Sequence, residues 1–210
     1  MIHLVDQGLE RHLRATVPLP TTVDVSFHAP DRSWSGGVTT PTVNLFLWDV
    51  SRNAKQSHTG IQEVERDGVL HRRLLPPVID LRYLVTAWAG DQRDEHQLLG
   101  AVLVAVLGHP VVADEHLPAA LTVTAPVRLS LASQPEGRSA DLWPALDGQL
   151  KPALQVNVSL SVDVGGLLEV GPPATGLVVR TEDTRSGARS GREAVEEGGR
   201  FAVAGGGEEG

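Results

Sequence analysis

The sequence lacks cysteine entirely, and it also lacks any long uncharged apolar segment. Without cysteine, disulfide bonds and thiolate metal sites are excluded, so a metal would have to be bound by histidine and carboxylate groups alone. The longest apolar run, from Leu98 to Leu107, is shorter than the roughly 18 residues that a membrane-spanning helix needs. We therefore predict no membrane partner.

Basic residues are outnumbered by acidic ones, and the formal net charge is −8. Nucleic-acid binding normally requires a basic surface, so this charge argues against a nucleic-acid partner. The first 14 residues, MIHLVDQGLERHLR, place charges inside the only apolar segment at that end, which is not the pattern of a secretory signal. We therefore expect synthesis and assembly in the cytoplasm of a bacterium.

The stretch from Val78 to Leu107 changes its hydrophobic period in mid-course. Its first part, up to Trp88, is rich in β-branched and aliphatic residues, which is typical of a strand. After Gly90 apolar residues recur at three- and four-residue spacing, which indicates a helix with Asp91 as its N-cap. The stretch therefore predicts a strand, a tight turn and a helix.

The same reasoning assigns the remaining elements. Strands are predicted at residues 23–27, 42–50, 69–88, 121–131 and 154–164, and helices at 2–15, 91–107 and 139–147. In the last strand apolar residues alternate with polar ones, so one face should meet the core and the other solvent or a neighbouring molecule. Residues 51–75 are predicted to form a hairpin or a long mobile loop.

These elements predict an α/β (α+β) fold with a single mixed, mostly antiparallel sheet and helices packed on one face. An extended C-terminal arm rich in Gly, Glu and Arg should follow. We place the folded domain at residues 1–168 and the arm at residues 169–210. The arm has little apolar surface of its own, so a strand at Leu177, Val178 and Val179 would form by adding to a sheet edge.

Candidate catalytic and metal-binding residues are few. His109, Asp114, Glu115 and His116 could together bind zinc or manganese, although their spacing fits no helix face and a polar loop is the favoured interpretation. The neighbouring acids Asp94 and Glu95 are explained by helix capping and by the helix dipole. No G-x-S-x-G nucleophile motif is present. We therefore predict no catalytic residue, no metal ligand and no cofactor.

Four separated segments resemble segments of one known protein family, and they occur along this chain in the same order as in that family. They are VNLFLW from Val43 with Asn53 beyond it, YLVTAW from Tyr83, EHQLLGAVL from Glu95, and LWPAL from Leu142 with Pro152 following. The chain resembles, over about residues 1–165, the N-terminal domain of the cap, or tail-terminator, protein of phage-tail-like contractile injection systems. It departs from the family pattern at Trp48, where a tyrosine is usual, and in its Gly- and Glu-rich tail.

The resemblance implies a structural, non-enzymatic protein. Such a protein forms a hexameric ring at the distal end of the particle, where it terminates the inner tube and anchors the last sheath ring. Its partners would be other copies of itself, the inner tube protein and the sheath protein, and the assembled particle can be released from the cell.

Several residues are candidates for subunit or partner contacts. Trp34 lies in a Gly-rich loop and Asn53 follows a strand, whereas Asn44 and Arg82 are polar residues inside apolar strands and could instead make structural hydrogen bonds. Residues 177–179 could dock on the sheath or on a neighbouring cap subunit.

Two other functions stay open at this point. One is a metal-dependent hydrolase of unknown substrate that uses His109, Asp114 and His116. The other is an adaptor that binds a peptide along the edge of its sheet.

Overall fold

The structure is a computed structural model. It describes residues 1–57, 60–66, 69–132, 139–166, 168–169, 176–182, 189–197 and 200–203. The chain forms two compact units, Met1–Gln62 with Arg73–Gly166 and Glu63–Arg72 with Leu167–Gly210.

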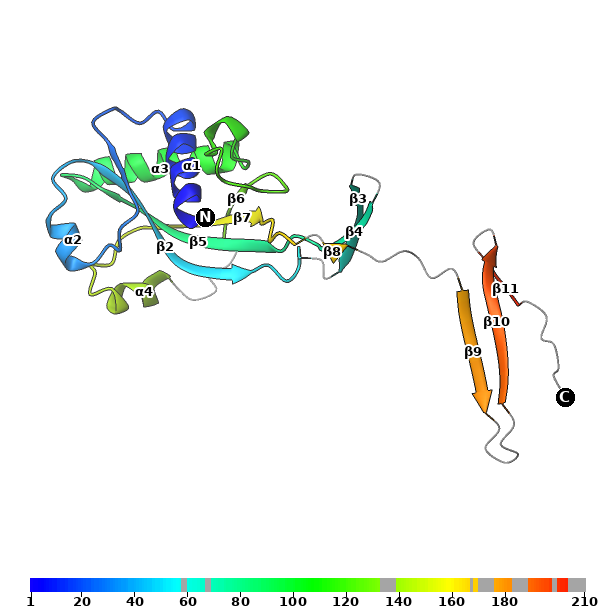
Figure 1. Ribbon diagram of the computed structural model, residues 1–210. Helices are drawn as coiled ribbons and strands as arrows, with labels where there is room; N and C mark the ends of the chain where they lie inside the picture. The colour runs from blue at the N-terminus through cyan, green and yellow to red at the C-terminus, as the bar shows by residue number, and fades with distance from the viewer. Residues whose placement is uncertain are drawn as a thin grey trace. The chain divides into compact units, whose positions relative to one another are not determined.

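The first unit is built on a five-stranded sheet with the order β1-β2-β5-β7-β6 (Figure 1). Its strands are β1 (Asp24–Ser26), β2 (Thr42–Arg52), β5 (Val78–Trp88), β6 (Arg128–Leu131) and β7 (Leu154–Ser161). The β1–β2 pair is parallel and the other pairs are antiparallel. The predicted α/β class and the mixed, mostly antiparallel sheet are therefore confirmed.

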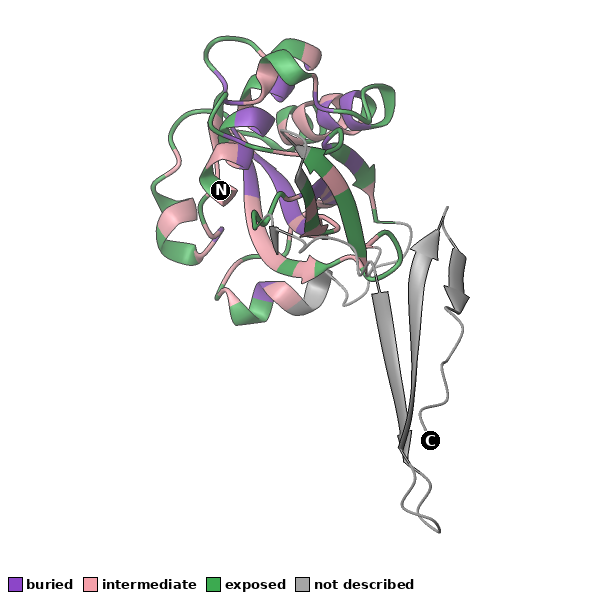
Figure 2. Ribbon diagram, turned by 45° about the vertical axis from the view of Figure 1, so that its right-hand side comes forward, coloured by how far each residue is buried: buried purple, intermediate pink, exposed green. Residues whose placement is uncertain are grey.

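One face of this sheet, which we call the inner face, packs under two helices, α1 (Ile2–Thr16) and α3 (Gln92–Gly108). The centre of this core is completely buried, as Leu81, Tyr83 and Val158 are all 0% exposed. Figure 2 shows buried positions on the strands and on the facing helices. The predicted strand, turn and helix are present, and the Asp91 carboxylate accepts a hydrogen bond from the Asp94 N–H at 2.9 Å, which is N-cap geometry.

The opposite face of the sheet, which we call the outer face, is covered at one end only. There the short helices α2 (Arg32–Gly36) and α4 (Ser139–Ala145) lie on the side away from α1 and α3 (Figure 1). Trp34 of α2 makes an edge contact with Trp88, with ring centroids 5.4 Å apart. The prediction that the helix near residues 139–147 shares a face with the other two is therefore wrong, because its buried Trp143 lies outside the main core.

Two of the predicted strands are shorter than expected. In the 121–131 region only β6 is a continuous strand, and Val123 makes an isolated bridge to Val162. In the 69–88 region Pro76 and Pro77 separate β4 (Val69–Leu74) from β5, because proline lacks the N–H that a central strand must donate. β4 joins a separate sheet of order β3-β4-β8 with β3 (Ile61–Arg66) and β8 (Leu168–Glu169), so the predicted single sheet is also wrong in this respect.

A third sheet lies in the C-terminal arm. Its strands are β9 (Gly176–Glu182), β10 (Arg189–Glu197) and β11 (Arg200–Val203), in the order β11-β10-β9 and antiparallel throughout. The described part of the arm is thus paired with itself rather than simply extended. No helix in the described residues is long and apolar enough to cross a membrane.

Candidate partner-contact site on the outer face

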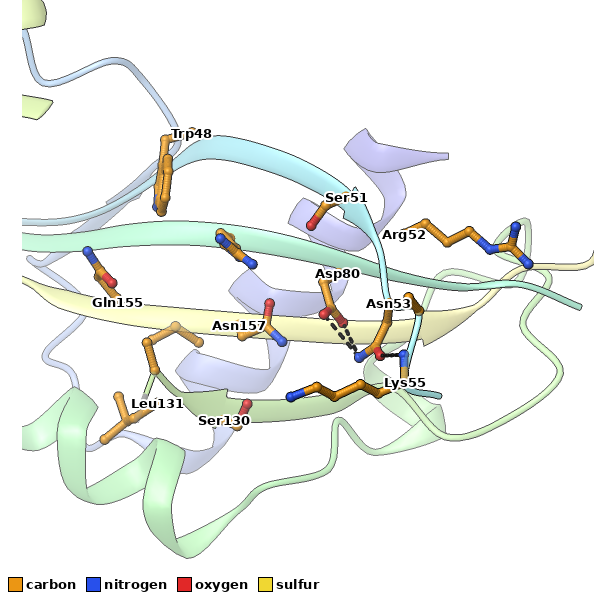
Figure 3. A pocket seen from close by; sticks show the side chains of 14 residues that line it. Trp48, Ser51, Arg52, Asn53, Lys55, Asp80, Ser130, Leu131, Gln155 and Asn157 are labelled. Atoms are coloured by element: carbon orange, nitrogen blue, oxygen red, sulfur yellow. Dashed lines mark hydrogen bonds between the residues drawn. The ribbon is translucent and has the colours of Figure 1, made fainter. Parts of the chain in front are cut away.

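The uncovered end of the outer face carries two rows of polar side chains that run across four strands. Because neighbouring antiparallel residues point to the same face, the strand register defines these rows directly. The first row is Ser51, Asp80, Ser159 and Arg128, and the second is Asp49, Arg82, Asn157 and Ser130. Figure 3 shows Asp80, Asn157 and Ser130 on three of these strands.

Asp80 is the centre of a hydrogen-bond network that holds the end of β2 in place. Its two carboxylate oxygens accept from the Asn53 amide at 3.0 and 3.2 Å, and Ser159 donates to one of them at 2.6 Å. The Asn53 carbonyl oxygen in turn accepts from the backbone N–H groups of Lys55 and Gln56. Asn53 therefore fixes the turn after β2 to the first part of β5.

A β-bulge places a second group of side chains beside this network. The register between β2 and β5 shifts between Leu47 and Asp49, so Trp48 is an extra residue, and Trp48 and Asp49 are both directed to the outer face. The Arg82 guanidinium lies 3.5 Å from the Asp49 carboxylate and 6.0 Å from the centre of the Trp48 ring. The bulge therefore gathers an aromatic ring, a cation and an anion at one point.

Trp48 and Arg82, together with Asn53 and Asp80, line an open hollow of about 570 Å³ (Figure 3). The Trp48 indole N–H and the side-chain carbonyl oxygen of Asn157, both in its wall, are buried and have no hydrogen-bond partner. An unpartnered buried donor or acceptor lowers the free energy of unfolding by about 1–3 kcal/mol, so these two groups destabilise the wall of the hollow.

The charge of the hollow differs from that of the whole chain. Its lining includes three cations, Arg52, Lys55 and Arg82, and one carboxylate, Asp80, whereas the chain as a whole has a net charge of −8. Cations in a protein of opposite net charge select for anionic partner groups.

Of the predicted contact residues, the structure brings Asn53 and Arg82 together in this hollow. Trp34 lies elsewhere, half-buried, with its ring stacked on His28 at 6.2 Å. Asn44 is 0% exposed, and its amide group bonds to both the N–H and the carbonyl of His28. Asn44 therefore makes structural hydrogen bonds, and a contact between Asn44 and a partner stays a prediction.

The predicted strand at residues 177–179 is present as part of β9. Val178 is paired with Glu193 of β10, and the surroundings of its side chain lie outside the described part of the structure. Docking of this strand on another protein stays a prediction.

Asp80 and Asn157 were not among the predicted contact residues, and Trp48 stood out only as a departure from the family pattern. Asn157 and Ser159 were visible as the polar half of the alternating 154–164 strand, but which residues face them depends on pairing between distant strands. The bulge at Trp48 has no signal of its own in the sequence.

The histidines of the hydrolase hypothesis belong to a different cluster. His12 of α1 is 3% exposed, and its Nδ1 lies 3.2 Å from the Nδ1 of His116, while its Nε2 lies 3.3 Å from the carbonyl oxygen of His109. Burial, together with the neighbouring imidazoles, lowers the pKa of His12. Among the described residues no group of three or more histidine or acidic side chains is arranged to bind a metal, so the set around His109, Asp114 and His116 does not converge.

Two solved terminators of contractile injection systems have a fold similar to that of this chain. The first is the sheath/tube terminator of the PVC extracellular contractile injection system in its extended state, with a TM-score of 0.62, 21% identity, and coverage of 89% of this chain and 65% of that one. The second is the tube-terminating cap of the anti-feeding prophage, AFP, with a TM-score of 0.56, 19% identity, and coverage of 85% and 60%. This chain thus spans less than two thirds of either protein.

The family model of the Pvc16 N-terminal domain matches residues 4–175, and the chain therefore belongs to the Pvc16 N-terminal domain family. The resemblance to cap proteins of contractile injection systems is thereby confirmed. Comparison with curated protein sequences gives no match.

Proposed function

We propose that this chain is a structural subunit that caps the distal end of a contractile injection particle. The observation that carries this proposal is the family match, which includes the whole five-stranded sheet and the outer-face hollow. The solved proteins of similar fold are a sheath/tube terminator and a tube-terminating cap. The subunit has no catalytic role in this account, and its action is geometric.

Capping requires a subunit with two unlike surfaces. A tube grows because each ring presents a mating surface to the next ring, and growth stops when a ring binds on one side and offers no mating surface on the other. We propose that six copies form such a ring, in register with the inner tube, and that the ring also anchors the last sheath ring. The particle assembles in the bacterial cytoplasm and is released afterwards.

The outer-face hollow is our candidate for the contact with the tube or sheath protein. Arg52, Lys55 and Arg82 would attract acidic side chains. Trp34, half-buried beside His28, is a second candidate contact.

The C-terminal arm, residues 169–210, is proposed to act apart from the domain of residues 1–168 by docking on sheath or neighbouring cap subunits. Deleting residues 171–210 should leave a folded domain, because the core of the five-stranded sheet lies before residue 166. Circular dichroism and thermal unfolding would check the fold, and electron microscopy would check particle assembly, with deletion of only residues 204–210 as the control. An unfolded product would contradict the independence of the arm.

The ring itself is tested by native mass spectrometry and electron microscopy of the purified protein with its inner tube protein. Six-fold rings on tube ends are the expected result. A monomer that binds a peptide but never decorates tubes would instead support the sheet-edge adaptor.

A further inference from the structure

Helix α3 carries an exposed apolar stripe on the side away from the core. Val104 and Leu107 are 70% and 63% exposed, although Val102, Ala105 and Val106 on the opposite side of the same helix are buried. A helix that is apolar all round is normally buried all round. The outer side of α3 therefore has the composition of a covered surface.

The stripe is also flat. Gly100 and Gly108 lie on the same side of the helix as Val104, at four-residue spacing, and a Cβ atom added at either glycine would meet nothing within 4 Å. A second backbone could therefore approach closely here. Arg93, exposed in the first turn, is three helical turns before Val104 on the same side. We call Arg93, Gly100, Val104, Leu107 and Gly108 the α3 stripe.

The β3–β4 hairpin exposes a second apolar pair, Ile61 and Leu74, each 63% exposed. The side chains of Arg72 and Glu63, and of Arg73 and Gln62, are bonded across the hairpin. This register places Ile61 opposite Leu74, so both belong to one face. Glu65, also exposed, is on the same face as Ile61 because the two residues are four apart on one strand. We call Ile61, Glu65 and Leu74 the hairpin edge.

The two surfaces are complementary in both chemistry and length. A strand rises about 13 Å from Ile61 to Glu65, and a helix rises about 16 Å between Arg93 and Val104. The long arginine side chain can span the difference between these two lengths. A strand lying along the stripe would thus cover Val104 and Leu107 with Ile61 and Leu74, and would bring Glu65 to Arg93.

We propose that the α3 stripe of one copy receives the hairpin edge of the next copy of this chain. This inference rests on the proposed capping function, because two different patches that bind each other form a head-to-tail interface, which closes into a ring when the rotation allows it. A single self-complementary patch would instead give a two-fold dimer.

The absence of cysteine makes the contact directly testable, because each introduced thiol is the only one in its chain. Leu107→Cys and Leu74→Cys proteins, purified separately and mixed, should give one strong cross-linked dimer with a short bis-maleimide reagent, and neither protein alone should. Leu150→Cys, at a leucine that is 67% exposed but outside both surfaces, is the matched partner for Leu107→Cys and should give no such product.

Charge reversal gives a second measurement. Arg93→Glu and Glu65→Arg should each weaken self-association several-fold in sedimentation experiments, and the double variant should recover it. Rings on tube ends without the mixed cross-link would overturn this interface and leave the capping function intact. Self-linking of Leu107→Cys alone would also overturn it. A chain that stays monomeric in the presence of tube protein would contradict the capping function itself.

Discussion

The two faces of the five-stranded sheet belong to the same strands but have opposite chemistry. On the inner face, Leu81, Tyr83 and Val158 are completely buried under α1 and α3. On the outer face, their direct neighbours in sequence, Arg82 and Asn157, are half-buried and polar. Because alternation along a strand separates the two sets, the protein can change its outer surface without altering its core. The comparison teaches that folding depends mainly on one face, and the other face is the one for which we propose partner binding.

The largest effect expected from this comparison is on the inner face. Leu81→Ala should lower the free energy of unfolding by about 2–5 kcal/mol, because it leaves a cavity at a position with no exposed surface. Gln155→Ala, on the outer side of the neighbouring strand, is the control and should change stability far less. Urea unfolding followed by tryptophan fluorescence would measure both. Equal losses for the two variants would contradict the division between the faces.

A smaller effect is expected from the hydrogen bond between Tyr83 of the core and Asp6 of α1. The Tyr83 hydroxyl donates a hydrogen bond of 2.7 Å to the Asp6 carboxylate, whose pKa is raised by burial and partly lowered again by this bond. Tyr83→Phe should cost about 1–3 kcal/mol at neutral pH. Without this bond the pKa of Asp6 rises further in the folded chain. A carboxyl group with a raised pKa stabilises the folded chain in acid and loses that contribution as pH rises. The loss of stability caused by Tyr83→Phe should therefore be smaller at low pH than at neutral pH.

Denaturant unfolding of this variant at several pH values would check that dependence. Asp6→Asn retains an acceptor for the tyrosine without the buried charge and is the matched control. A cost that is the same at every pH would show that the tyrosine bond does not influence the carboxyl group.

The stability that His12 of α1 contributes should decrease in acid. The pKa of His12 is lowered from 6.5 in the folded chain, so the unfolded chain binds the proton more readily. Stability from this group is therefore complete above about pH 6.5 and is lost as pH falls from there toward the folded pKa. His12→Gln should flatten that decline, whereas His96→Gln, at an exposed position on α3, should preserve it.

Thermal unfolding across this pH range would measure the difference. An unchanged decline in His12→Gln would mean that other groups cause it.

The smallest effect on stability is expected on the outer face. Arg82→Ala removes a partly exposed ion pair with Asp49, and such pairs contribute about 0–1 kcal/mol. If the hollow binds a partner, the same change should nevertheless weaken binding to tube or sheath protein strongly. Arg14→Ala, which breaks the exposed pair with Glu10 on α1, is the control and should leave binding unchanged. Pull-down or interferometry would compare the two, and equal binding would exclude the hollow.

Most of the element order could be predicted from the sequence, and the reason is local. The strand and helix between Val78 and Leu107 differ in hydrophobic period, and Asp91 caps the helix with its own side chain. Pro76 and Pro77 separate two strands wherever the sheets lie, since neither residue can donate a backbone hydrogen bond.

The remaining features depend on contacts between distant residues. Asp80 and Ser159 are 79 residues apart, and His12 and His116 are 104 apart, so no spacing in the sequence could show that they meet. The same applies to α4, because a short amphipathic helix indicates that it packs on a sheet but not on which face. The candidate site was therefore predicted only at Asn53 and Arg82.

The capping account is tested most directly by the length of inner tubes grown from their purified protein with and without this chain. The account predicts that substoichiometric amounts of the chain shorten the tubes and leave a ring at one end, visible by electron microscopy. Tubes that keep growing to the same length with bare ends, in the presence of folded and excess chain, would contradict it.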